Sequence, residues 1–180
     1  MSANLKLLVL AMGLLAAILG YFGYERFAKS RLVFGTPIDA RQLLQAASRD
    51  GAVLVRTLGG ALGESAEALN ARVVEKLRAS IAEPWLQLET DATKTRNTFA
   101  LAFLFDGPSD TSPNFAQLCA GTLPALHPQT KDINVYAVLC GPNGPVIGIQ
   151  GWTKRPETAD APALLRLIEQ TGLAALRGNT

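Results

Sequence analysis

The chain has 180 residues, of which 48% are hydrophobic and 18% are charged. Single domains usually run to about 100–200 residues, so the length allows one domain and a short additional segment. The apolar content excludes intrinsic disorder. One histidine and two cysteines exclude a histidine-rich catalytic centre, a multi-cysteine zinc module and a disulfide-dense scaffold.

The net charge of +2 is located near the start of the chain. Residues 1–31 contain four basic side chains and one acidic one, leaving 13 Lys and Arg against 14 Asp and Glu in residues 32–180. A nucleic-acid-binding domain would instead gather basic residues on a folded face, interleaved with aromatic residues. No nucleic-acid partner is therefore expected.

A run of 18 uncharged residues from Leu7 to Tyr24 predicts a transmembrane helix. At 1.5 Å per residue it covers about 27 Å, close to the roughly 30 Å hydrocarbon core of a bilayer. Aromatic and then basic residues at its end are typical of a membrane interface, namely Tyr21, Phe22, Tyr24, Arg26 and Lys29. We expect the lipid bilayer to be contacted through residues 5–24.

A cleaved signal peptide is the competing interpretation of this segment, since it also has a charged start and an apolar run. Each candidate cleavage pair contains one large residue: Ala17/Leu19, Ile18/Gly20 and Tyr21/Gly23. A retained anchor in the inner membrane is therefore favoured. The basic residues after the run would place the domain in the cytoplasm. A short N-terminal tail usually stays inside, however, and long domains translocate largely regardless of charge, which favours a periplasmic domain.

The predicted organisation is an anchor helix with a basic flank over residues 1–30, a linker over 31–37 and a globular domain over 38–180. In chain order, the domain begins with a helix capped by Asp39 and a buried strand over 52–58. Apolar residues at steps of three and four predict a helix over 64–81, and alternation predicts a strand over 85–91.

The second half is predicted to hold three more strands and two more helices. Residues 98–105 are apolar on both sides, which predicts a central strand, and Ser112 with Pro113 predicts a helix start. Strands over 133–140 and 146–152 flank a Gly-Pro-Asn-Gly-Pro hairpin turn. A last helix starts at Thr158 or Asp160.

Two helix–hairpin units in series, 64–105 and 112–152, predict the fold class. This is an α+β sandwich in which a largely antiparallel sheet carries helices on one face, following one transmembrane helix. The helix–strand–strand doublet resembles small periplasmic domains of secretion and pilus machines, although no motif residue carries the likeness.

Cys119 and Cys140 are the two thiols, one on a predicted helix and one at the end of the next strand. In an extracytoplasmic domain they can form a disulfide; the alternative is two separate small apolar residues. Redox catalysis is not indicated, because the chain has no C-x-x-C motif.

The glycine-rich turn at residues 59–63, between a strand and a helix, occupies the position at which some proteins bind phosphate. Its spacing matches neither common phosphate motif, and a tight turn capped by Ser65 explains the same residues. Residues 63–67 also resemble a nucleophile elbow, with Glu67 in place of the second glycine. Ser65 with His127, oriented by Asp106 or Asp132, would then be a hydrolase site.

Asp106, Asp110 and Asn114 offer oxygen atoms four residues apart in a loop. Calcium loops place their ligands at alternate positions and end with a bidentate glutamate, so a solvated turn explains these residues better. No metal and no cofactor are predicted.

Aromatic and basic residues near the hairpin form the candidate contact surface, made of Tyr136, Trp152, Lys154 and Arg155. Aromatic side chains often anchor protein interfaces. The expected function is therefore a non-catalytic interaction module, acting as an accessory or assembly subunit of a bacterial envelope membrane complex. The alternatives are the anchored hydrolase using Ser65 and His127 and a receptor for a small ligand or anion.

Overall fold

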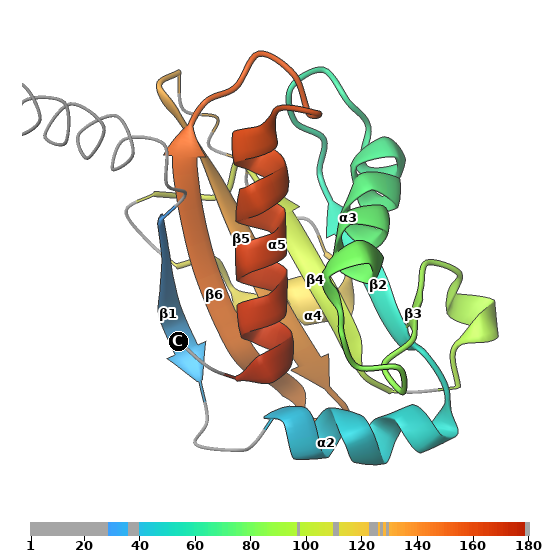
Figure 1. Cartoon of the computed structure of the whole chain (residues 1–180). Helices are drawn as coiled ribbons and strands as arrows, with labels where there is room; N and C mark the ends of the chain where they lie inside the picture. Colours follow the sequence, from blue (N-terminus) through green and yellow to red (C-terminus); the bar gives the residue numbers. More distant parts are fainter. Residues whose placement is uncertain are drawn as a thin grey trace, which may run out of the picture.

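The computed structural model describes residues 29–35, 40–96, 98–109, 112–122, 126, 128 and 130–178. These residues form an α+β domain around a six-stranded sheet with the strand order β1-β6-β5-β4-β2-β3 (Figure 1). The strands are β1 (Lys29–Gly35), β2 (Val53–Leu58), β3 (Leu88–Glu89), β4 (Ala100–Phe105), β5 (Asp132–Gly141) and β6 (Gly144–Lys154). The helices are α2 (Ala40–Ala47), α3 (Ala66–Ser80), α4 (Phe115–Ala120) and α5 (Pro162–Arg177).

The sheet is mixed, which corrects the predicted, largely antiparallel sheet. Strand β2 runs parallel to both β3 and β4, whereas the β4–β5, β5–β6 and β1–β6 pairs are antiparallel. The chain leaves β2, crosses over through α3 and returns in the same direction, as a helical crossover requires. Strand β2 thus lies between β3 and β4, so the hairpin predicted from 85–91 and 98–105 does not form.

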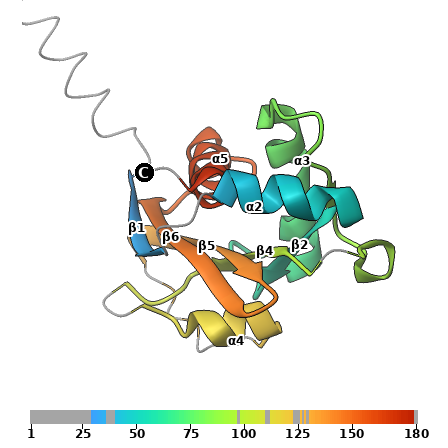
Figure 2. The same cartoon turned by 90° about the horizontal axis from the view of Figure 1, so that it is seen from below.

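Helices cover both faces of the sheet, which also corrects the predicted fold class. Helices α2, α3 and α5 lie on one face, and α4 lies on the other, here called the α4 face (Figure 2). The reason lies in β4, whose six residues are all buried. A strand that is apolar on both sides needs cover on both sides.

The larger core lies between the sheet and helices α3 and α5. Within it, α5 lies unusually close to strand β6. A Cβ atom on Gly151 of β6 would come within 2.5 Å of Leu167 and of Thr171 on α5. Only a residue without a side chain allows the helix to lie so near the strand.

The transmembrane helix of the predicted fold class is not found: within the described part of the chain, no helix is both long and apolar enough to cross a membrane. Residues 7–24 lie outside that part, as do Tyr21, Phe22, Tyr24 and Arg26. Lys29 is the first residue of β1, which pairs with β6. Most of this strand, residues 31–35, lies in the segment predicted to be a linker. Strand β6 pairs with β5 on one side, and its other side has unpaired backbone N–H and C=O groups to which β1 can hydrogen-bond. It is 11 residues long, enough to pair with the whole of β1.

Candidate binding site on the α4 face

Helix α4 covers only part of its face of the sheet. It has six residues, about 9 Å of helix, and packs on apolar positions that include Tyr136, Val138 and Cys140 of β5. Further along the same face, β5 presents Asn134 and Asp132, because alternate residues of a strand share a face. The sheet therefore changes from apolar to polar where the helix ends.

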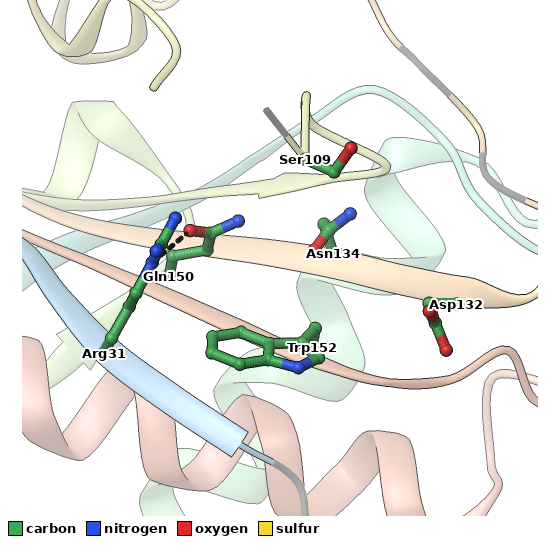
Figure 3. A pocket seen from close by; sticks show the side chains of 6 residues that line it. All are labelled: Arg31, Ser109, Asp132, Asn134, Gln150 and Trp152. Atoms are coloured by element: carbon green, nitrogen blue, oxygen red, sulfur yellow. Dashed lines mark hydrogen bonds between the residues drawn. The ribbon is translucent and has the colours of Figure 1, made fainter. Parts of the chain in front are cut away.

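A hollow of about 320 Å³ lies over this polar part of the face (Figure 3). Its described lining comes from β1, β5, β6 and the segment after β4: Arg31, Ser109, Asp132, Asn134, Gln150 and Trp152. Asn134 pairs with Trp152, and Tyr136 pairs with Gln150, in the β5–β6 register. The register thus brings the two amide side chains and the indole together.

Arg31 holds one side of the hollow in place. Its Nε donates a hydrogen bond of 2.9 Å to Oε1 of Gln150, and its guanidinium carbon lies 5.9 Å from the centroid of the Trp152 ring. A cation over an indole ring is attracted by the negative face of the ring. Arg31 therefore fixes the orientation of Gln150 and Trp152 together.

Asn134 is the most unusual residue of the hollow. It is 5% exposed, yet among the described residues its side-chain amide has no hydrogen-bond partner. Gln150 is 3% exposed, and no described residue accepts from its amide nitrogen. In the described part of the chain, only Nε of Arg56 and Nε of Arg72 are both fully buried and unpartnered, so the two amides keep access to the hollow.

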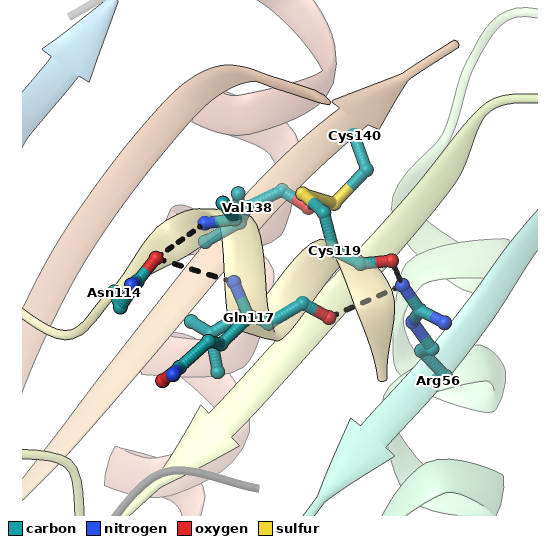
Figure 4. The surroundings of a disulfide bond; sticks show 8 residues. Arg56, Asn114, Gln117, Cys119, Val138 and Cys140 are labelled. Carbon is teal, nitrogen blue, oxygen red and sulfur yellow. Dashed lines mark hydrogen bonds between the residues drawn. A yellow bond between two sulfur atoms is a disulfide. The ribbon is translucent and has the colours of Figure 1, made fainter. Parts of the chain in front are cut away.

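A disulfide between Cys119 and Cys140 joins α4 to β5, with 5.5 Å between the Cα atoms, so the possible bridge, one of the two alternatives left open by the sequence, is present (Figure 4). On β2, Arg56 donates to the carbonyl oxygens of Leu118, at 3.1 Å, and Cys119. These carbonyls lie at the C-terminal end of α4, where a positive charge is favourable. Burial lowers the pKa of Arg56.

The other end of α4 is capped by Asn114, two residues after the predicted start. Its Oδ1 accepts hydrogen bonds from the backbone N–H groups of Ala116 and Gln117, at 3.0 and 3.3 Å (Figure 4). Asparagine is among the preferred residues at this position. Helix α4 is thus fixed at both ends and by a covalent bond, which keeps the border of the hollow in place.

An ion pair stands at the end of β4 near the hollow. Asp106 is 3% exposed and accepts from both terminal nitrogens of Arg155, at 2.7 and 2.8 Å. The hydrogen bond that Arg155 donates to Asp106 raises the pKa of Arg155, and the neighbouring negative charge adds to this. The backbone N–H of Arg155 also donates to the carbonyl of Lys131, at 2.8 Å, which joins this corner to the start of β5.

The four residues of the predicted contact surface occupy different environments. Tyr136 is 1% exposed under α4, and its hydroxyl donates to the Pro108 carbonyl at 2.6 Å. Arg155 pairs with Asp106, whereas Trp152 is half-buried in the hollow and Lys154 is exposed beside it. Their role in contacts remains a prediction.

The sequence analysis did not identify Arg31, Asn134 and Gln150 as site residues. The feature that could have pointed to them is that they are polar residues within otherwise apolar strands.

Ser65, the nucleophile of the alternative hydrolase, has another role in the structure. The Ser65 hydroxyl accepts from the backbone N–H of Ala68 at 3.3 Å and caps α3, and His127 lies outside the described residues. Asp106 is held by Arg155, and the Asp132 side chain lines the hollow on the α4 face. The structure thus gives Ser65 a capping role.

In the glycine turn of the alternative anion site, the backbone N–H of Glu64 donates to the carbonyl oxygen of Ala61 at 2.9 Å. Arg72 pairs with Glu64 at 2.7 Å and also with Asp160. Of the three loop residues that were weighed as calcium ligands and not favoured, Asp106 and Asn114 have protein partners, and Asp110 lies outside the described residues. Within the described part of the chain, no group of three His, Cys, Asp or Glu residues could hold a metal ion.

No protein-family model matches the chain, and no curated protein matches it. Among solved structures, it is similar to a PelC variant dodecamer from Paraburkholderia phytofirmans, with 12% identity and a TM-score of 0.49 over 84% of this chain and 98% of that chain. A second PelC dodecamer from the same organism gives 9% identity and a TM-score of 0.47, over 86% and 100% of the two chains. Likeness at this distance does not indicate a function.

Proposed function

We propose that this domain is a non-catalytic binding module that works outside the cytosol, as an accessory subunit of a bacterial envelope assembly. The observation that carries the proposal is the uncovered part of the α4 face. There Trp152 borders a hollow next to a buried amide, Asn134, that has no partner among the described residues. A concave surface with an aromatic wall and a few convergent polar groups is typical of a binding site.

The disulfide supports the proposed location outside the cytosol. Bridges between cysteines persist in oxidising surroundings such as the periplasm and are rare in the cytosol. The Cys119–Cys140 bond joins α4 to the sheet beside the hollow, so it helps to support the hollow.

Exposed apolar residues support the proposal that a protein partner binds next to the hollow. On the edge strand β1, Leu32 is 47% exposed and Phe34 is 39% exposed, and these are the large exposed hydrophobic residues of the described chain. The Phe34 ring lies 6.2 Å from the Phe115 ring of α4, which places it on the same face as Trp152. The surface therefore extends from the hollow to the edge of the sheet.

Two measurements test the proposal. Alkylation of thiols in intact cells, before and after reduction, should find Cys119 and Cys140 oxidised; free thiols in the native protein would contradict the extracytosolic assignment. Native electrophoresis of the full chain should show a complex that Trp152→Ala reduces and Lys94→Ala, on an exposed turn, leaves unchanged. Migration as a monomer without partners in both variants and parent would contradict the accessory role.

A further inference from the structure

We infer that the hollow over β5 and β6 binds a neutral saccharide unit. The inference rests on the proposed function only in using the same surface, and it adds a class of ligand that a protein partner does not imply. Its starting point is the pair of buried amides that open into the hollow, Asn134 and Gln150.

The unpaired atoms of these amides match adjacent hydroxyl groups. Asn134 offers both an acceptor oxygen and a donor nitrogen, whereas Gln150 offers its donor nitrogen, because its oxygen already accepts from Arg31. A hydroxyl group donates one hydrogen bond and accepts others, so two neighbouring hydroxyls on a ring can satisfy both amides. Because these amide atoms keep access to the hollow, a ligand of this kind can take the place of water as their hydrogen-bond partner.

The indole of Trp152 supplies the apolar wall that a sugar ring also needs. It borders the hollow beside the amides, and Arg31 fixes its orientation (Figure 3). A pyranose ring carries C–H groups on one side and hydroxyls along its rim. It can therefore pack on the indole and hydrogen-bond to the amides in one position.

The charges around the hollow favour a neutral ligand. Asp132 and Arg31 both line it, and Asp132 pairs with Lys154 in the β5–β6 register. An anionic ligand would meet the Asp132 carboxylate, and a cationic one would meet the Arg31 guanidinium. The volume of about 320 Å³ is at the lower end for ligand sites, which suits one or two sugar rings.

The test uses the full chain with Trp85→Phe, which leaves Trp152 as the single tryptophan. Its fluorescence is followed during titration with three neutral trisaccharides: maltotriose, cellotriose and triacetylchitotriose. At least one should give a saturable change in emission. Asn134→Ala should weaken that binding by at least about tenfold, since it removes two hydrogen bonds to the ligand. Gln117→Ala, an exposed amide on α4, should leave the affinity unchanged.

Ligand-observed NMR of Trp152→Ala gives a second measurement that does not depend on fluorescence or on the Asn134 variant. Trp152→Ala should abolish saturation transfer to the sugar C–H protons, and Trp152→Phe should retain part of it. The inference is overturned if no trisaccharide binds at high millimolar concentration, if Asn134→Ala binds as tightly as the parent, or if only inorganic phosphate or a diamine binds. Such a result leaves the native complex of the proposed function intact, so the two failures are distinguishable.

Discussion

Asp106 and Arg155 form a two-point ion pair, with each terminal nitrogen of the guanidinium bound to a different carboxylate oxygen at 2.7 and 2.8 Å. The pair joins the end of β4 to the residue after β6, and Asp106 is 3% exposed. Two parallel hydrogen bonds between charged groups give both strength and a fixed direction. They hold the corner of the sheet from which Ser109 reaches the hollow.

Arg155→Met should leave the Asp106 carboxylate buried without its partner. We expect it to lower the free energy of unfolding by about 2–3 kcal/mol, below the 3–5 kcal/mol of a fully buried pair, because the Arg155 side chain is 23% exposed. Urea unfolding measures this. Adding Asp106→Asn should recover part of the loss, since it removes the unpaired charge and asparagine tolerates the positive φ of 54°. A loss in the double variant equal to the sum of the two single losses would contradict the coupling.

Removing the disulfide should destabilise the domain. The bond closes a loop across 21 positions of sequence, and loop entropy gives about 3 kcal/mol for such a loop. Cys119→Ala with Cys140→Ala should lower the free energy of unfolding by this amount, as should reduction of the parent protein. The double variant is its own control, because a reductant should not change its stability. An unchanged unfolding midpoint in the reduced parent would contradict the assigned role.

Arg56→Met should loosen α4 while leaving the opposite face intact. It removes the hydrogen bonds to the carbonyls of Leu118 and Cys119. We expect a loss of about 1–2 kcal/mol in unfolding free energy and faster amide exchange in 115–120, with α3 and α5 unchanged. Arg166→Met, an exposed arginine on α5, is the matched control. Equal exchange rates in α4 of both variants would show that Arg56 does not hold the helix.

The ion pair between Lys76 and Glu169, at 2.8 Å, links α3 to α5 and should make stability depend on pH. The hydrogen bond from Lys76, helped by Ser80, lowers the pKa of Glu169 from its ordinary 4.5. A lowered folded pKa stabilises the native state above the unfolded value and loses that effect as the pH falls through the folded value. Glu169→Gln should therefore cost about 0.5 kcal/mol at pH 7, because the pair is partly exposed, and progressively less as the pH falls below 4.5 towards the folded pKa. A difference that stays constant over this pH range would contradict this.

The sequence predicted most elements but not how they are arranged. Helix α3 was predicted over 64–81 because its apolar residues repeat every three or four positions, and it forms over Ala66–Ser80. The position of β2 between β3 and β4 could not be predicted, since pairing depends on the crossover through α3 and not on any local pattern. The same holds for β1, whose residues become a strand only because β6 offers an edge.

The candidate site was predicted only in part. Cys119 and Cys140 were recognised as a possible pair, and Trp152 was placed on a contact surface. The hollow depends on where α4 ends over the sheet, which the spacing of residues does not contain. Asn134 and Gln150 become meaningful only once the β5–β6 register brings them beside Trp152.

The central claim is that the uncovered part of the α4 face is where this domain binds. It is tested most directly by placing a photo-crosslinking residue at Lys154 in living cells, next to Trp152, and at Lys94 as an exposed control on another part of the surface. The account predicts a discrete crosslinked product from Lys154 that Trp152→Ala weakens and that Lys94 does not give. Identical products from the two positions, or a product from Lys94 alone, would contradict it.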